Sequence, residues 1–492
     1  MPVWHAPFLN DRFDETTLQH TVSAGLSVDD GRGVSDLSAA GERPDRIAGA
    51  GYARRLGLFS ATMMVVGGII GSGIFLNPAI VAQRVGTTPA IMTIWSAGAV
   101  IAIVGALVFA ELGARAPSAG GGYVYLRDAF GRFPAFLYGW ALFLMVSTGA
   151  IAAVAVSSAS YAVSAFGMPV SWATPIAVAS IIVLTIVNIA GVTPGAITQN
   201  VATVLKLGVI LMLVAVAFLI PAEIRATSTM RGPDVPDNAF AWVVAFGTAL
   251  VPVLFAFGGW QQTNFIAEEM RDPRRDLPRA LVLGVSIVVA AYLLVNIAYL
   301  RALGVAGLAA STAPAAETFH ALLGDGGRRI IAAGIVISSL GFLNLVILVT
   351  PRVYQAMAAD GVFFARMARV DERTRTPVDA LIGQAIWAIV LLFSGSYGQL
   401  LDYVVFGDWL FFGATAATLF VYRAREARGA LPRSEVRALG HPYTTLLFLA
   451  AAVYVVSGSI VSNPGNAARG TALLVLGVPA FAWWNRAKRR SQ

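Results

Sequence analysis

Apolar runs long enough to cross a bilayer recur along the chain from residue 58 onward. An α-helix needs about 20 predominantly apolar residues to span the hydrocarbon core of a membrane. The composition agrees, because 57% of the 492 residues are hydrophobic and 13% are charged, whereas soluble domains carry about 25% charged residues. A transmembrane β-barrel would show alternating segments of roughly ten residues, and these runs are continuous. The sequence therefore predicts an all-α polytopic membrane protein.

About twelve transmembrane helices are predicted from these runs. They are expected at residues 58–84, 88–114, 132–165, 171–190, 198–221, 240–269, 278–303, 327–356, 377–396, 399–422, 441–462 and 468–485. Helices 1, 3, 6 and 8 are longer than a bilayer needs, so they must tilt, break or extend beyond it. Between helices 7 and 8, residues 312–323 could form either a re-entrant loop or a solvated connector.

Three regions follow from this pattern. Residues 1–54 are polar, carry mixed charge and lack the apolar stretch of a signal peptide, so we expect a disordered cytoplasmic tail. Residues 55–425 would hold the first ten helices. Residues 426–492 would add helices 11 and 12 and a basic cytoplasmic tail.

The placement of the basic residues explains the net charge of +8 better than a nucleic-acid partner does. With the N-terminus in the cytoplasm, most of the 35 Lys and Arg fall in cytoplasmic segments, including clusters at residues 271–279, 366–375, 423–437 and 486–490. This distribution follows the positive-inside rule. We expect a multi-pass protein of the cell's inner (plasma) membrane, with both termini cytoplasmic and no nucleic-acid partner.

Glycine interrupts two of the predicted helices. Residues 66–75 (VGGIIGSGIF) place glycines and a serine inside helix 1, and residues 255–260 (FAFGGW) place a glycine pair inside helix 6. Glycine lowers helix propensity and tolerates irregular backbone angles. Either stretch could instead be a close helix-packing surface, which small residues also permit. Unwound backbone at membrane depth is tolerated where it lines a cavity, so the pair of breaks favours a binding site.

The two breaks lie five helices apart, at corresponding positions of two halves. Because five is odd, consecutive units insert in opposite directions, so helices 1–5 and 6–10 would form inverted repeats with helices 11 and 12 appended. Gly-interrupted helices in such positions point to the substrate site of a secondary transporter. We therefore expect alternating access, with the substrate bound between the breaks.

Each break exposes amides at the start of one half-helix and carbonyls at the end of the other. Since a helix N-terminus attracts an anion, the amides of Ser72 and Gly73, with the Ser72 hydroxyl, could hold a carboxylate. The carbonyls of Ile69, Phe255 and Gly258 could hold an ammonium group. The predicted substrate-binding residues are Ile69, Gly71, Ser72, Gly73, Phe255, Ala256, Gly258, Trp260 and Gln261, with Ser338, Ser339 and Trp409 as candidate pocket walls.

Some of these residues have an alternative interpretation. Trp260 and Trp409 could mark the membrane interface, where tryptophan is abundant. Ser338 and Ser339 could hydrogen-bond between helices, which is the commoner use of serine there.

Three stretches closely resemble the amino acid–polyamine–organocation (APC) transporter superfamily, in particular its L-type amino acid transporter (LAT) branch and its bacterial relatives. They are GGIIGSGIF at residues 67–75, PSAGGGYVYLRDAFG at 117–131 and FAFGGWQQTNFIAEEMRDPRRDLPRA at 255–280. The resemblance covers residues 55–425 in matching order. It implies a five-plus-five inverted-repeat fold with broken helices 1 and 6.

The resemblance also implies roles for individual residues. The α-carboxylate of an amino acid would bind at Ser72 and Gly73 and its α-amine at Ile69, Phe255 and Gly258, while Phe255 would gate the pocket. The sequence departs from the family pattern in two places, which bear on the substrate side chain. It has Gln261–Gln262 where an Asn is common, and Asp408–Trp409 where Asn–Trp occurs.

Lys206 lies inside predicted helix 5. A charged group at membrane depth is costly and by default functional, although its long side chain could snorkel to the interface. In L-type relatives a lysine at this place occupies the volume of a sodium ion found in sodium-coupled proteins. The resemblance therefore implies that Lys206 replaces an ion site, ties helix 5 to the helix 1 break and makes transport independent of sodium.

Four further acidic residues have candidate roles. Glu111 can pair with Arg115 one helical turn away, and Glu268 and Glu269 are expected in a charge network at the inner end of helix 6. Asp408 could lie near the pocket or face elsewhere in the bundle.

The sequence predicts sodium-independent transport of neutral L-amino acids, with exchange as the favoured mode. Proton-coupled symport is the alternative, and an intramembrane enzyme is a remote one, because no acid–base or metal set converges in the sequence. We expect no enzymatic activity, no cofactor and no metal site; the four His are scattered, and no P-loop or HExxH motif is present. The expected partners are a small amino acid and the lipid bilayer. Since there is no Cys, no disulfide-linked subunit is expected.

Overall fold

The computed structural model describes residues 51–220, 235–394, 397–462 and 464–491. Most of the predicted tail at residues 1–54 lies outside these ranges. Within them the backbone forms helices and loops, and one isolated β-bridge joins Leu56 to Met270. This agrees with the predicted all-α class.

The helices of the first half follow the apolar runs. They are α1 (Leu58–Ile69), α2 (Gly73–Val85), α3 (Thr88–Arg115), α4 (Gly122–Phe130), α5 (Arg132–Ala141), the π-helical turn η1 (Leu142–Val146), α6 (Ser147–Phe166), the short 3₁₀ helix η2 (Val170–Trp172), α7 (Ala173–Ile189) and α8 (Val192–Leu219).

The remaining helices complete the bundle. They are α9 (Ala239–Ala256), the 3₁₀ helix η3 (Trp260–Glu269), α10 (Pro273–Ala310), α11 (Pro314–Leu323), α12 (Asp325–Val349), α13 (Pro351–Ala359), the short 3₁₀ helix η4 (Ala365–Ala368), α14 (Val378–Ser394), α15 (Tyr397–Ala427), α16 (Tyr443–Ser462), α17 (Pro464–Val475) and α18 (Gly477–Ser491).

Membrane-spanning helices dominate the described residues. Nine helical segments among them are long and apolar enough to cross a bilayer, or ten if the bent pair α1 and α2 is one span. The multi-pass prediction is confirmed, whereas the count of twelve stays a prediction. The expected span at residues 377–396, for example, appears as the 17-residue helix α14, which is shorter than each of the nine qualifying segments.

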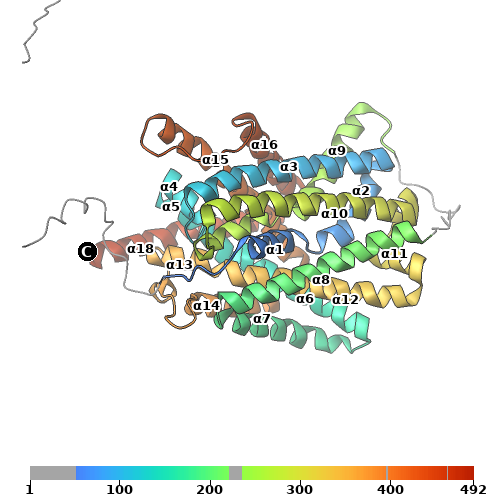
Figure 1. Cartoon of the computed structure of the whole chain (residues 1–492), viewed down its shortest axis with the longest axis horizontal. Coiled ribbons are helices and arrows are strands. Elements are labelled where there is room, and N and C mark those ends of the chain that lie inside the picture. The colour runs from blue at the N-terminus through green and yellow to red at the C-terminus, as the bar shows by residue number, and fades with distance from the viewer. Residues whose placement is uncertain (1–50, 221–234, 395–396, 463, 492) are drawn as a thin grey trace, which may run out of the picture. The chain divides into compact units, whose positions relative to one another are not determined.

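Lipid-facing and protein-facing surfaces separate along the helices. On α7, Ile182, Val183 and Ile186 are about half exposed, as expected for side chains that meet acyl chains rather than water. By contrast α10 packs against α1, α2, α3 and α8, and Figure 1 shows it running between α3 and α8. Tyr292 and Tyr299 of α10 are fully buried by these contacts.

The segment between α10 and α12 is a helix rather than a solvated connector. Residues 314–323 form α11, which packs against α12, α10 and α8. Pro314, Ala315, Thr318 and Phe319 are buried by this packing. Of the two alternatives for this stretch, a solvated connector is therefore wrong.

Both predicted breaks are present. Helix α1 ends at Ile69 and α2 begins at Gly73, with a bend of 41° between them. Helix α9 ends at Ala256, and the 3₁₀ helix η3 begins at Trp260 after Gly259, whose φ is +104°. A left-handed backbone of this kind favours glycine, which has no Cβ to clash. The glycine pattern therefore predicts these interruptions correctly.

Candidate functional site

Side chains from other helices satisfy the carbonyls freed at the first break. The ammonium of Lys206, from α8, donates to the carbonyls of Gly67 (3.1 Å) and Ile70 (2.9 Å). The Ser338 hydroxyl, from α12, donates to the same Ile70 carbonyl at 3.3 Å. Lys206 is fully buried, so it does not reach the membrane interface. Because an unsatisfied carbonyl at membrane depth is costly, these contacts hold the break open.

Tyr292 of α10 links the two breaks and is a residue that sequence reasoning missed. Its hydroxyl lies 3.0 Å from the Ile69 carbonyl and 3.3 Å from the Ala256 carbonyl, so its single proton is shared between the last residue of α1 and the last residue of α9. In the sequence it is one tyrosine within a long apolar helix, with no local pattern that marks it.

The second break is satisfied mainly by neighbouring residues. The Gly258 amide donates to the Phe255 carbonyl at 3.1 Å, and the Gly259 amide donates to Oε1 of Gln261 at 3.0 Å. The backbone also approaches the first break closely, because a Cβ added at Gly68 would lie 2.8 Å from the Gly259 carbonyl oxygen. Only glycine fits at such an approach.

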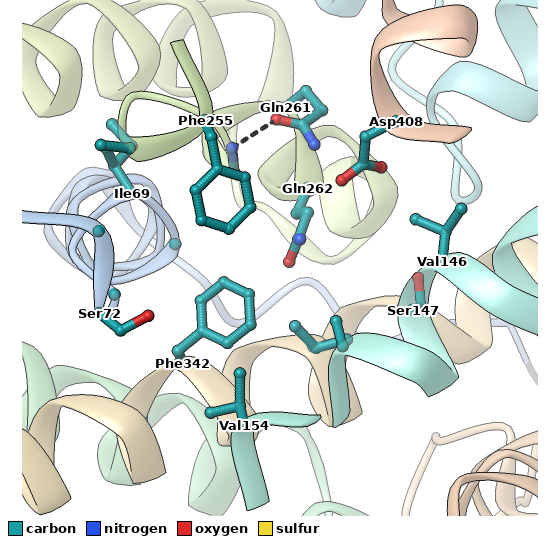
Figure 2. Close-up of a pocket in the computed structure, with 18 of the residues that line it drawn as sticks. Ile69, Ser72, Val146, Ser147, Val154, Phe255, Gln261, Gln262, Phe342 and Asp408 are labelled. Atoms are coloured by element: carbon teal, nitrogen blue, oxygen red, sulfur yellow. Dashed lines mark hydrogen bonds between the residues drawn. The ribbon is translucent and has the colours of Figure 1, made fainter. Parts of the chain in front are cut away.

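A cavity of about 1090 Å³, counted with the space where it opens to solvent, lies between the breaks. Figure 2 shows Ile69 and Ser72 on one side of it, with Phe255 and Phe342 facing each other across it. The predicted residues that line it are Ile69, Gly71, Ser72, Gly73, Phe255, Ala256, Gly258, Gln261, Ser339 and Trp409.

Two predicted wall residues do not line this cavity. Trp260 is buried against Phe109 and Phe448, with ring centroids 4.9 and 6.1 Å away. The positive φ of Gly259 redirects the chain just before Trp260, and its indole fills the space behind the break. The Ser338 hydroxyl donates to the Ile70 carbonyl. The adjacent Ser339 lines the cavity instead.

The start of α2 presents donors to the cavity. The first amides of an α-helix have no partner within the helix, and those of Ser72 and Gly73 donate no backbone hydrogen bond to any residue that the structure describes. In Figure 2 the Ser72 hydroxyl points into the space beside Phe342. This combination of amides, a hydroxyl and a helix N-terminus suits an anion.

The three carbonyls predicted to face an ammonium group are engaged to different degrees. Ile69 accepts from the Gly71 amide at 2.9 Å and from Tyr292, which occupies both lone pairs of its oxygen. Phe255 accepts from the Gly258 amide. The Gly258 carbonyl accepts from no amide or side chain within the described ranges, so of the three it is the most available to a ligand.

Asp408 of α15 also lines the cavity. The sequence left its position open between the pocket and the rest of the bundle. Figure 2 shows its carboxylate directed toward the cavity, on the same side as Gln261 and Gln262. The wall opposite the broken helix 1 therefore carries an ionisable carboxyl group.

Two other buried carboxylates lie outside the cavity and have arginine partners. Glu111 pairs with Arg115 at 2.7 Å, as predicted from their spacing, and also with Arg423 at 2.6 Å. Glu269 pairs with Arg352 at 2.7 Å, and not with the arginines that follow it in the sequence. The Glu111–Arg423 and Glu269–Arg352 pairs join segments distant in sequence, so they act as packing contacts.

Comparison with known proteins agrees with this geometry. The family model described as "Amino acid permease" matches residues 56–480. The b(0,+)-type amino acid transporter 1 of Mus musculus is 30% identical over 415 residues, which are 84% of this chain and 83% of the relative. The large neutral amino acids transporter small subunit 2 of Homo sapiens is 30% identical over 465 residues, 92% and 84% respectively. The chain is a multi-pass membrane protein and belongs to the amino acid permease family.

Proposed function

We propose that this protein moves L-amino acids across the membrane by alternating access, as a sodium-independent exchanger that accepts neutral substrates. One observation supports this most strongly. Two interrupted helices meet at a cavity that offers the amides of Ser72 and Gly73 on one side and the Gly258 carbonyl on another. Such a site matches the carboxylate and ammonium that every α-amino acid carries, and it needs no charged side chain to do so.

Alternating access follows from where the site lies in the fold. In the proposed cycle, helices 1 and 6 with their neighbours 2 and 7 rock against helices 3, 4, 8 and 9, and the cavity opens to each side in turn. The Phe255 ring borders the cavity and would close it in one of these states. The five-plus-five inverted repeat and the cytoplasmic location of both termini belong to the same proposal.

Sodium independence rests on Lys206. Its ammonium already donates to two carbonyls of the first break, and a sodium ion would compete for oxygens of this kind. Because the Lys206 ammonium takes the place of a bound sodium ion, the site forms without sodium. Transport then does not require a sodium gradient. The relatives named as small subunits raise the question of a partner chain. Because the sequence has no Cys, any such contact would be non-covalent.

Uptake into proteoliposomes tests the proposal. Purified protein is reconstituted with or without internal leucine, and uptake of labelled leucine is followed in sodium and in choline buffer. We expect uptake that needs internal leucine and is equal in both buffers. Uptake that is absent under all conditions would contradict amino acid transport, and uptake that needs sodium would contradict the role given to Lys206.

Proton-coupled symport is the second candidate, and the carboxylate of Asp408 on the cavity wall is the observation in its favour. In the same liposomes, an inward proton gradient without internal amino acid separates the two modes. An exchanger shows no concentrative uptake under this gradient, whereas a symporter accumulates leucine above the external level.

A further inference from the structure

The carboxyl group of Asp408 on the cavity wall differs from those of Glu111 and Glu269, the buried carboxylates described above. Glu111 and Glu269 each have an arginine within 2.7 Å. Asp408 has no ion pair or hydrogen bond with another residue in the described part of the chain. No Lys or Arg is among the residues that line its cavity. A carboxylate removed from water without a partner is costly, so the site as built favours a cation supplied from elsewhere.

A second acceptor lies beside this carboxylate. The side-chain oxygen of Gln262 is buried and has no hydrogen-bond partner among the residues that the structure describes, although Gln262 lines the same cavity. Its neighbour Gln261 differs, because its oxygen accepts from the Gly259 amide. In Figure 2 the side chains of Gln262 and Asp408 both extend into the cavity. This side of the cavity is therefore rich in acceptors.

The Asp408 carboxyl group comes from a different helix than the groups proposed to hold the α-amino and α-carboxylate ends, and Gln262 follows the second break on η3. Those groups belong to the two breaks, whereas Asp408 belongs to α15. A substrate held by its two ends at the breaks must direct its side chain to another part of the cavity. An ammonium brings three donors and a guanidinium five, and either would pair with a carboxylate and an amide oxygen.

We propose that Asp408 and Gln262 determine side-chain specificity, and that they extend the substrate range to amino acids whose side chain ends in an ammonium or guanidinium group. The inference rests on the proposed amino acid transport. It assigns Asp408 to binding of the side chain rather than to holding the fold or carrying protons.

The test compares ligands of similar size and different charge. Arginine and citrulline differ in a guanidinium against a neutral ureido group, and lysine and norleucine differ in an ammonium against a methyl group. Each competes with uptake of labelled leucine into the proteoliposomes, for the wild-type protein and for Asp408→Asn. The exposed Asp379 of α14 supplies the matched control, Asp379→Asn, because it makes the same chemical change away from the cavity.

We expect arginine to compete better than citrulline with the wild-type protein. In Asp408→Asn the half-inhibitory concentration of arginine should rise roughly tenfold to a hundredfold, as for a lost charged hydrogen bond. The half-inhibitory concentrations of citrulline and norleucine should change less than about threefold. Gln262→Leu should weaken arginine by a smaller factor, and Asp379→Asn should leave all four ligands unchanged.

The outcomes separate this inference from the proposed function. If wild-type protein takes up leucine but arginine and lysine do not compete, the inference fails and amino acid transport stands. If Asp408→Asn weakens all four ligands equally, or abolishes a response to a proton gradient for every substrate, Asp408 has a structural or proton-carrying role and the inference fails. Absence of leucine uptake by the wild type contradicts the proposed function itself.

Discussion

The two breaks obtain their backbone hydrogen bonds from different places. At the first, the Gly71 amide donates locally to Ile69, and three further donors arrive from other helices: Lys206 of α8, Tyr292 of α10 and Ser338 of α12. At the second, two of the three contacts come from within residues 255–261, and only Tyr292 is distant. The first break therefore depends on tertiary packing, whereas the second is largely encoded by its own short sequence.

This difference leads to graded predictions. Changes at a glycine of the second break should reduce folding stability, because they strain the local backbone that forms this break. Changes at the distant donors of the first break should act on transport while the bundle persists. The predictions below run from the largest expected effect to the smallest.

Gly259→Ala should have the largest effect. Its φ of +104° suits glycine, and an added Cβ would overlap the carbonyl oxygen of Gly68. Strain of this kind costs about 1–3 kcal/mol before the overlap is counted. We expect a clearly lower melting temperature in detergent and little transport. Gly208→Ala is the control, because nothing lies within 4 Å of its added Cβ and alanine favours a helix by about 1 kcal/mol. Equal melting of both variants would contradict the expectation.

Lys206→Ala should reduce transport by about tenfold or more, because it removes charged hydrogen bonds worth about 1.5–3 kcal/mol each. The lost contacts are those to the Gly67 and Ile70 carbonyls. Helix content by circular dichroism and elution on size exclusion should match the wild type. Leu205→Ala, at a half-exposed position of the same helix, controls for truncation. Full activity of Lys206→Ala would refute its role.

Tyr292→Phe should lower the transport rate by roughly threefold to tenfold, since a neutral hydrogen bond contributes about 0.5–1.5 kcal/mol. The ring contacts with Trp95 and Phe257 remain, so the fold should be retained. The matched control is Tyr299→Phe on the same helix, whose hydroxyl makes one longer bond of 3.4 Å to the Ile74 carbonyl. Initial rates of leucine exchange measure both. A larger effect at Tyr299 would show that bridging the two breaks is unimportant.

Ser338→Ala should have the smallest effect and lower the transport rate by less than about threefold. This corresponds to less than the free energy of one neutral hydrogen bond. The Ile70 carbonyl keeps its shorter bond from Lys206 when the serine hydroxyl is removed. A loss as large as that of Lys206→Ala would mean that the two donors act together.

The same contrast explains which features of the fold and the site could be predicted from the sequence. The interruptions were predictable because glycine acts locally on helix propensity, and so was the Glu111–Arg115 pair, which is set by helical spacing. Tyr292 was not predictable, because its hydroxyl serves carbonyls far away in the sequence. Ser338 and Ser339 could not be distinguished either. Neighbouring residues point roughly 100° apart on a helix, and only the packing of α12 decides which one meets the cavity.

Trp260 and Asp408 illustrate the other limit. Both stand next to residues of the predicted pocket, yet the tryptophan packs behind the break and the aspartate faces the cavity. The direction of Trp260 depends on the left-handed turn at Gly259, which a glycine permits but does not require.

The hydroxyl of Tyr292 has a mechanical consequence. Because the single proton of this hydroxyl is shared between the Ile69 carbonyl at the end of α1 and the Ala256 carbonyl at the end of α9, moving one end away from the other changes this hydrogen bond in a site shielded from water. Tyr292 thereby couples the movements of α1, α9 and α10. The bonds from Lys206 and Ser338 reach the first break from α8 and α12, so in the proposed cycle we expect these bonds to stretch and re-form when α1 and α9 rotate.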